Sequence, residues 1–161
     1  MIDKIIDQLV EQFNTQLGPE SSADDKLGLV TNVSLDNIYT TCPNRTLSIV
    51  EGPMTPQDFE VGLFQPATWL YEPIELQLIC KGTEKAAKET RRKFVSAIRQ
   101  AIYNSTTRTA LIGMENVEGN ETERVLKYNL MKIRTDFAAS KNLFFFIAVF
   151  QLSITTEISV A

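Results

Sequence analysis

The residue types that usually carry out catalysis or bind transition metals are scarce in this sequence of 161 residues, which contains no histidine. Without histidine the chain cannot form a Ser-His-Asp triad, a Cys-His dyad or a histidine ligand to a metal ion. Its seven glycines are scattered and form neither a GxGxxG nor a GxxxxGK(S/T) phosphate-binding loop. Catalysis by carboxylates alone stays open, but spacing singles out no pair of them, so we expect neither an enzyme nor a bound cofactor.

Two acidic stretches hold the carboxylates that Ca²⁺ or Mg²⁺ would need. Asp24 and Asp25 are adjacent, and four glutamates follow later in the chain: Glu115, Glu118, Glu121 and Glu123. Neither stretch has the ligand spacing of an EF-hand loop. We interpret both as solvated loop charge and predict no metal site.

Positive charge is concentrated in one segment. Residues 81–104 carry seven basic groups against two acidic ones, a balance of +5, whereas the whole chain has a formal net charge of −4. Four of the basic residues are predicted to share one helix face, away from Phe94 and Ile98: Lys85, Lys88, Arg92 and Arg99. We expect this face to be a surface of contact or of solvation rather than core.

Three interpretations of the basic face stay open. It can be a solvated outer face with Glu84–Lys88 and Glu89–Lys93 ion pairs. Nucleic-acid binding is less favoured, because the chain is acidic overall and the face lacks aromatic residues for base stacking. The third is contact between copies, in which the basic helix meets the acidic N-terminal helix or the acidic loops of a neighbour, as in a ring closed head to tail.

The basic face belongs to a strand–helix unit around which the chain is organised. Apolar and polar residues alternate from Ile74 to Lys81, which predicts a strand with one buried face. Gly82 ends the strand, and the hydroxyl of Thr83 is expected to cap the helix that follows over residues 84–104. Cys80 falls on the apolar side of the strand, which favours a reduced, buried thiol.

The N-terminal half begins with an amphipathic helix over residues 2–17, which we expect to end at Gly18 as a C′ glycine followed by proline. Short strands are predicted next, in three ranges: Leu27–Val33, Asn37–Thr41 and Thr46–Glu51. Residues 52–73 then form a proline-rich excursion with four large aromatic residues: Phe59, Phe64, Trp69 and Tyr71. Because proline is excluded from central strands, we predict an extended arm that either folds back on its own core or lies on another subunit.

The C-terminal half is predicted to be mainly strand. Arg108–Gly113 and Val125–Arg134 read as strands, separated by an acidic loop, and a turn follows at Asp136–Asn142. Leu143–Thr155 is apolar on both faces over its first eight residues, so both faces should be covered and this strand should be central. That apolar run is too short to span a bilayer, and no cationic, apolar leader opens the chain, so we expect cytosolic synthesis and no membrane.

Together these elements predict one α+β domain over residues 1–161: a mixed, mainly antiparallel sheet with two helices packed on it and a proline-rich extended arm. The order of features resembles the tail terminator, or tail-completion, proteins of long-tailed bacteriophages. The likeness covers residues 27–155 and is carried by the strand PIELQLICKG, the helix AAKETRRKFVSAIRQAI and the final strand LFFFIAVFQLSI.

The resemblance implies a structural virion protein without catalysis. Its subunits would form a homohexameric ring that is assembled in the host cytoplasm, caps the tail tube and joins it to the head or neck. The implied partners are other copies of the chain, the tail tube protein and a neck or head-completion protein, with the genome passing through the lumen without specific binding. The alternatives are a head–tail joining or neck subunit and, from another class, a small cytosolic ligand-binding or enzymatic domain. The candidate interface residues are Phe59, Phe64, Trp69, Tyr71, Lys85, Lys88, Arg92 and Arg99.

Overall fold

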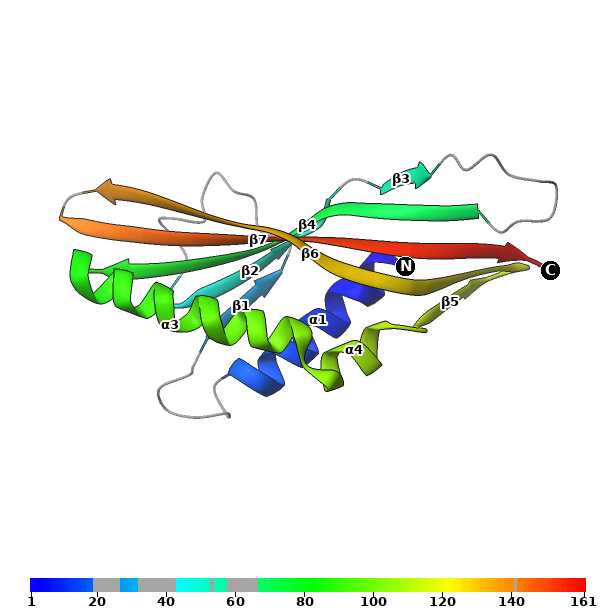
Figure 1. Ribbon diagram of the computed structural model, residues 1–161, viewed down its shortest axis with the longest axis horizontal. Coiled ribbons are helices and arrows are strands. Elements are labelled where there is room, and N and C mark those ends of the chain that lie inside the picture. Colours follow the sequence, from blue (N-terminus) through cyan, green and yellow to red (C-terminus); the bar gives the residue numbers. More distant parts are fainter. Residues whose placement is uncertain (19–26, 32–42, 53, 58–66, 141) are drawn as a thin grey trace.

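The computed structural model shows an α+β fold in which the helices lie on one face of a long, twisted sheet (Figure 1). It describes residues 1–18, 27–31, 43–52, 54–57, 67–140 and 142–161. For residues 29–31, 54–57, 67–73 and 140 it describes the backbone alone.

Within these ranges the chain forms three helices and seven strands. The helices are α1 (Ile2–Leu17), α3 (Glu84–Tyr103) and α4 (Ser105–Leu111). The strands are β1 (Gly28–Thr31), β2 (Thr46–Val50), β3 (Met54–Gln57), β4 (Ala67–Gly82), β5 (Glu115–Glu118), β6 (Glu121–Ser140) and β7 (Leu143–Val160).

The sheet has the strand order β1-β2-β4-β7-β6-β5, and β3 pairs with β4 outside this path. β1 and β2 run parallel, and every other described pair is antiparallel. The predicted mixed, mainly antiparallel sheet is therefore confirmed. Of the three short strands predicted early in the chain, the first and third correspond to β1 and β2, and Asn37–Thr41 lies outside the described residues.

The final strand is central, as its two apolar faces predicted. β7 lies between β4 and β6, and residues 145–150 are all buried. Phe146, Ala148 and Phe150 pack into the core beneath the helices, whereas Ile147 and Val149 are buried on the other face. The strand continues to Val160, beyond the predicted end at Thr155.

The first helix and the long basic helix are confirmed at the predicted positions, but both caps differ. Thr83 is the N-cap of α3, yet its side chain makes no capping hydrogen bond. Gly18 ends α1 in an extended conformation (φ −75°, ψ −176°) rather than a left-handed one. Glycine suits this position because a Cβ there would clash with the backbone carbonyl oxygen of Asn14.

The strand predicted at Arg108–Gly113 is wrong, because the chain forms α4 there. Thr106, Thr107 and Thr109 are β-branched, and such residues favour strands. The helix forms because the Asn104 side chain accepts a hydrogen bond from the backbone N–H of Thr106 (2.9 Å) and the Thr107 hydroxyl donates to the carbonyl of Ala101 (2.8 Å). The fold thus has three described helices, not two.

The predicted acidic loop and the turn at Asp136–Asn142 are also corrected. Glu115–Glu118 pairs antiparallel with the start of β6 around Gly119, whose φ of +64° suits a tight hairpin turn. β6 then runs to Ser140 apart from two register shifts, so of the predicted turn only residues 141 and 142 lie between β6 and β7, and residue 141 lies outside the described residues.

The prediction that proline excludes residues 52–73 from the sheet is wrong. Pro56 lies in β3 and pairs with Trp69 of β4, while Pro73 falls at the register shift between Tyr71 and Ile74. Proline is tolerated at such positions because edge strands and bulges leave N–H groups unpaired. Residues 54–57 and 67–73 therefore belong to the sheet rather than to an extended arm.

Candidate subunit interface

Four exposed cations form a row on the outer face of α3, which we call the basic stripe: Lys85, Lys88, Arg92 and Arg99. At about 100° per residue their directions fall within roughly 60° of one another, and at 1.5 Å per residue they extend over about 21 Å. The opposite face of α3 is buried in the core through Phe94, Ile98 and Ala101. The predicted separation of basic and apolar faces is thus confirmed.

The basic stripe makes no hydrogen bond or ion pair with other described residues. In particular, the Glu84–Lys88 and Glu89–Lys93 ion pairs of the solvated-face interpretation are not formed within the described part of the chain. The neighbouring cation behaves differently. Arg91 donates to the carbonyl of Asp136 (3.2 Å) and lies 4.9 Å from the centre of the Phe146 ring. α3 therefore carries a cation, Arg91, that contacts the rest of the fold and four others, those of the basic stripe, that are exposed to solvent.

An aromatic residue shares the face of the basic stripe, contrary to the sequence-based expectation. Tyr103 lies 18 positions after Lys85, five helical turns, and so returns to the same direction. Its side chain is 56% exposed. The signal was present in the sequence as the spacing of four between Arg99 and Tyr103.

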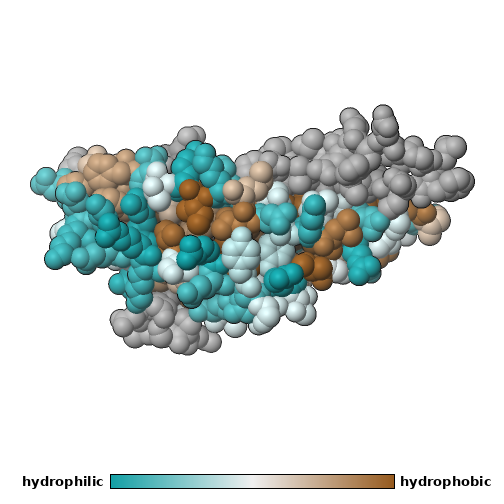
Figure 2. Space-filling view, in the orientation of Figure 1, coloured by the Kyte–Doolittle hydropathy of each residue, from teal (hydrophilic) through white to brown (hydrophobic). Residues whose placement is uncertain are grey.

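The outer edge of β6 was not foreseen from the sequence. Beyond Arg124, where the pairing with β5 ends, no described strand pairs with this edge. Leu126 and Met131 are the residues skipped at its two register shifts, and they are 40% and 52% exposed. Figure 2 shows hydrophobic side chains among hydrophilic ones on this side of the molecule. Bulges and charges, such as Lys127 and Lys132, are common devices that limit unwanted pairing at an exposed edge.

A second charged surface lies at the β5–β6 hairpin, where a hollow of about 390 Å³ is lined by acidic side chains. We call it the acidic hollow. Met1, Ile2 and Gly52 form part of its lining, and the other lining residues are polar or acidic: Glu51, Asn116, Glu118, Glu121 and Glu123. Two of the glutamates accept hydrogen bonds, one from Thr156 (2.6 Å, to Glu123) and one from Asn116 (3.0 Å, to Glu118). Among the described residues, no group of three or more candidate ligands is arranged to hold a metal ion.

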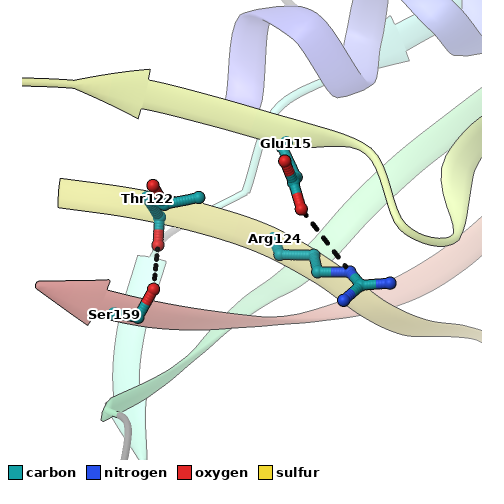
Figure 3. A network of polar contacts seen from close by, with 4 residues as sticks. All are labelled: Glu115, Thr122, Arg124 and Ser159. Atoms are coloured by element: carbon teal, nitrogen blue, oxygen red, sulfur yellow. Dashed lines mark hydrogen bonds and ion pairs between the residues drawn. The ribbon is translucent and has the colours of Figure 1, made fainter. Parts of the chain in front are cut away.

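The register of the hairpin explains why the hollow is so acidic. Glu118 pairs with Glu121, and Asn116 pairs with Glu123, so these side chains share one face. Arg124 instead pairs with Glu115 on the opposite face, where their side chains lie 3.9 Å apart (Figure 3). Arg124, the only cation of residues 115–124, is thus directed away from the hollow. Glu118 and Glu121 lie directly opposite each other, and like charges in such a pair are destabilising.

The four aromatic residues predicted to anchor an interface remain untested. Trp69 and Tyr71 contribute backbone to β4, but their side chains lie outside the described residues, as do Phe59 and Phe64 entirely.

Two titratable groups, one fully and one partly buried, have structural roles. Cys80 is fully buried beneath α3, and desolvation raises its thiol pKa to about 12, so the thiol is neutral and unreactive in the folded protein. Burial also raises the pKa of Tyr128, whose hydroxyl donates to the carbonyl of Ile102 (2.7 Å) and ties β6 to the end of α3. None of the described helices is both long enough and apolar enough to cross a membrane.

Comparison with known proteins does not place this chain in a family. No family model matches the sequence, and no curated protein matches it. Among solved structures, the chain is similar to one titled "Virion of native gene transfer agent (GTA) particle", with a TM-score of 0.43 and 11% sequence identity. The match covers 95% of this chain and 91% of that one. At this TM-score and identity the likeness assigns neither a family nor a function.

Proposed function

We propose that this chain is a structural virion protein of a tailed phage or phage-like particle, and more specifically a tail terminator subunit. In this role, copies of the chain close into a ring, hexameric in the resembled family, that caps the tail tube and joins it to the neck or head. The chain acts by binding and shape and carries out no catalysis. Its partners are other copies, the tail tube protein and a neck or head-completion protein, while the genome passes through the lumen without specific binding.

The proposal is supported first by the order of elements. The terminator-like features named from the sequence correspond to β4, α3 and β7, which follow one another in the predicted order and pack together in one core. The feature that carries the proposal is the pair of charged surfaces. A basic stripe without described partners and an acidic hollow are what a subunit needs in order to join neighbours on two sides.

The experiment is an end-binding assay on tail tubes from the phage or prophage that encodes the chain. Purified protein is added to bare tubes, and negative-stain images are scored for added density at the tube ends. We expect density at one end only, and tubes so treated should join to DNA-filled heads. Binding to isolated heads but not to tubes would favour the alternative neck subunit, and binding to neither would refute the proposal.

A further inference from the structure

We propose that the basic stripe of one copy docks on the acidic hollow of the next copy, so that the contact between subunits is head to tail. This inference rests on the proposed assembly function and adds to it the two surfaces that meet. The partner that occupies each surface is a second copy of this chain.

The two surfaces lie at different ends of the molecule. The basic stripe starts where α3 begins, next to the end of β6 and the start of β7, whereas the hairpin of the acidic hollow lies beside the end of β7 (Figure 1). The first three cations of the stripe therefore cannot reach the hollow of their own copy. Two different patches that match each other between copies define a heterologous contact, which closes into a ring or extends as a filament.

The charges of the two surfaces are opposite in sign. The stripe carries four cations, and the hollow presents the carboxylates of Glu51, Glu118 and Glu121 beside Glu123, which already accepts the Thr156 hydroxyl. The repulsion between Glu118 and Glu121, which the hairpin register enforces, would be relieved by cations from outside. Each surface also carries one large exposed apolar side chain, Tyr103 beside the stripe and Val160, which pairs with Glu121, beside the hollow.

A second copy of the chain matches both charged surfaces, whereas a nucleic acid matches only the basic stripe. Phosphates could neutralise the basic stripe, but they would leave the acidic hollow unmatched and would be repelled by a chain of net charge −4. A basic partner protein could fill the hollow but would leave the stripe unmatched. A second copy satisfies both surfaces in one contact that repeats around the ring.

The test is a charge swap with two double variants. Lys88→Glu with Arg92→Glu places two negative charges in the middle of the stripe, so that its four charges sum to zero. Glu118→Lys with Glu121→Lys likewise places two positive charges among the carboxylates of the hollow. Each variant alone should assemble poorly, with the concentration for half-assembly raised at least about tenfold, because several attractive pairs become repulsive. Mixed in equal amounts, the two variants should assemble again, since every contact in an alternating ring would then join opposite charges.

A matched control carries the same charge change elsewhere. Lys127→Glu with Lys132→Glu alters two exposed cations that pair with Thr155 and Gln151, on the sheet face away from the helices. This control should assemble as the unmodified chain does, and the far-ultraviolet circular dichroism of all three variants should be unchanged. Assembly is followed by light scattering, both in solution and on tail tubes.

Failure of this inference is distinguishable from failure of the proposed function. If the chain forms rings on tubes but both swapped variants assemble normally, or the mixture does not recover, the docking surfaces are wrong while the function stands. If the stripe variant assembles normally but no longer binds a labelled DNA duplex, measured by fluorescence anisotropy, the stripe serves nucleic acid instead. If the unmodified chain neither self-assembles nor binds tubes, the function itself is refuted.

Discussion

Two adjacent arginines of α3 should separate folding from assembly when each is replaced by methionine. Arg91 is half-buried and joins α3 to β6 and β7 through the Asp136 carbonyl and the Phe146 ring. Arg92 is exposed and makes no described contact of this kind. Methionine keeps the length and apolar character of the side-chain stem, so each substitution tests mainly the guanidinium group.

The expected loss for Arg91→Met is about 1–2 kcal/mol of unfolding free energy. The cation–π contact contributes about 0.5–1 kcal/mol at a site open to solvent. A hydrogen bond adds about 1 kcal/mol. Here the contribution is smaller, because the donor–acceptor distance is 3.2 Å and water competes at this exposed site. Arg92→Met should change the unfolding free energy by no more than about 0.5 kcal/mol, as is usual for exposed positions.

Urea unfolding at low protein concentration, followed by circular dichroism, measures the stability of the unassembled chain. Assembly is then measured below the unfolding transition for both variants. We expect Arg91→Met to lower stability and to assemble normally, and Arg92→Met to keep its stability and to assemble less well. Equal losses of stability, or an assembly defect confined to Arg91→Met, would refute the division between folding and interface cations.

Three further predictions follow from the structure. Asn104→Ala should cost about 0.5–2 kcal/mol in the same urea assay because α4 loses its cap, and Asn104→Asp should cost much less; equal effects would argue against the cap. Assembly should weaken as salt rises, because the Debye length falls from about 10 Å at 0.1 M to about 3 Å at 1 M, and a ring unaffected by salt would indicate an apolar contact instead. In a Cys42→Ser background, Cys80 should react with a thiol reagent only as fast as the protein opens, and rapid labelling of the native chain at pH 8 would contradict its burial. The unfolding free energy should also fall as pH rises from about 9 toward 12, because the pKa of the thiol is 9.0 in the unfolded chain and about 12 when buried.

The sequence carried enough information for the elements whose signal is local. The apolar period of α1 and α3 and the two apolar faces of β7 each depend on one continuous stretch, so their positions were predicted within a few residues. The same reasoning failed where a local preference competes with context. Three threonines favour a strand at residues 106–109, yet one Asn104 cap and the Thr107 hydrogen bond stabilise a helix turn there.

The charged surfaces were predictable only in part. A helical wheel places the basic stripe on one face, because it needs the sequence of α3 alone. The acidic hollow depends on the pairing of Glu118 with Glu121 and of Arg124 with Glu115, which is fixed by the hairpin register rather than by composition. Whether the edge of β6 is open likewise depends on which strands are its neighbours. No glycine, proline or other local pattern marks its two register shifts in the sequence.

The central claim is that this chain assembles into a closed ring, and native mass spectrometry of the purified protein tests it most directly. The spectrum should show one dominant oligomer of defined copy number, six if the resembled family is followed, at low salt and micromolar concentration. Negative-stain class averages of the same sample should show a ring with a central opening. A strictly monomeric protein under these conditions that also leaves the ends of tail tubes bare would contradict the account.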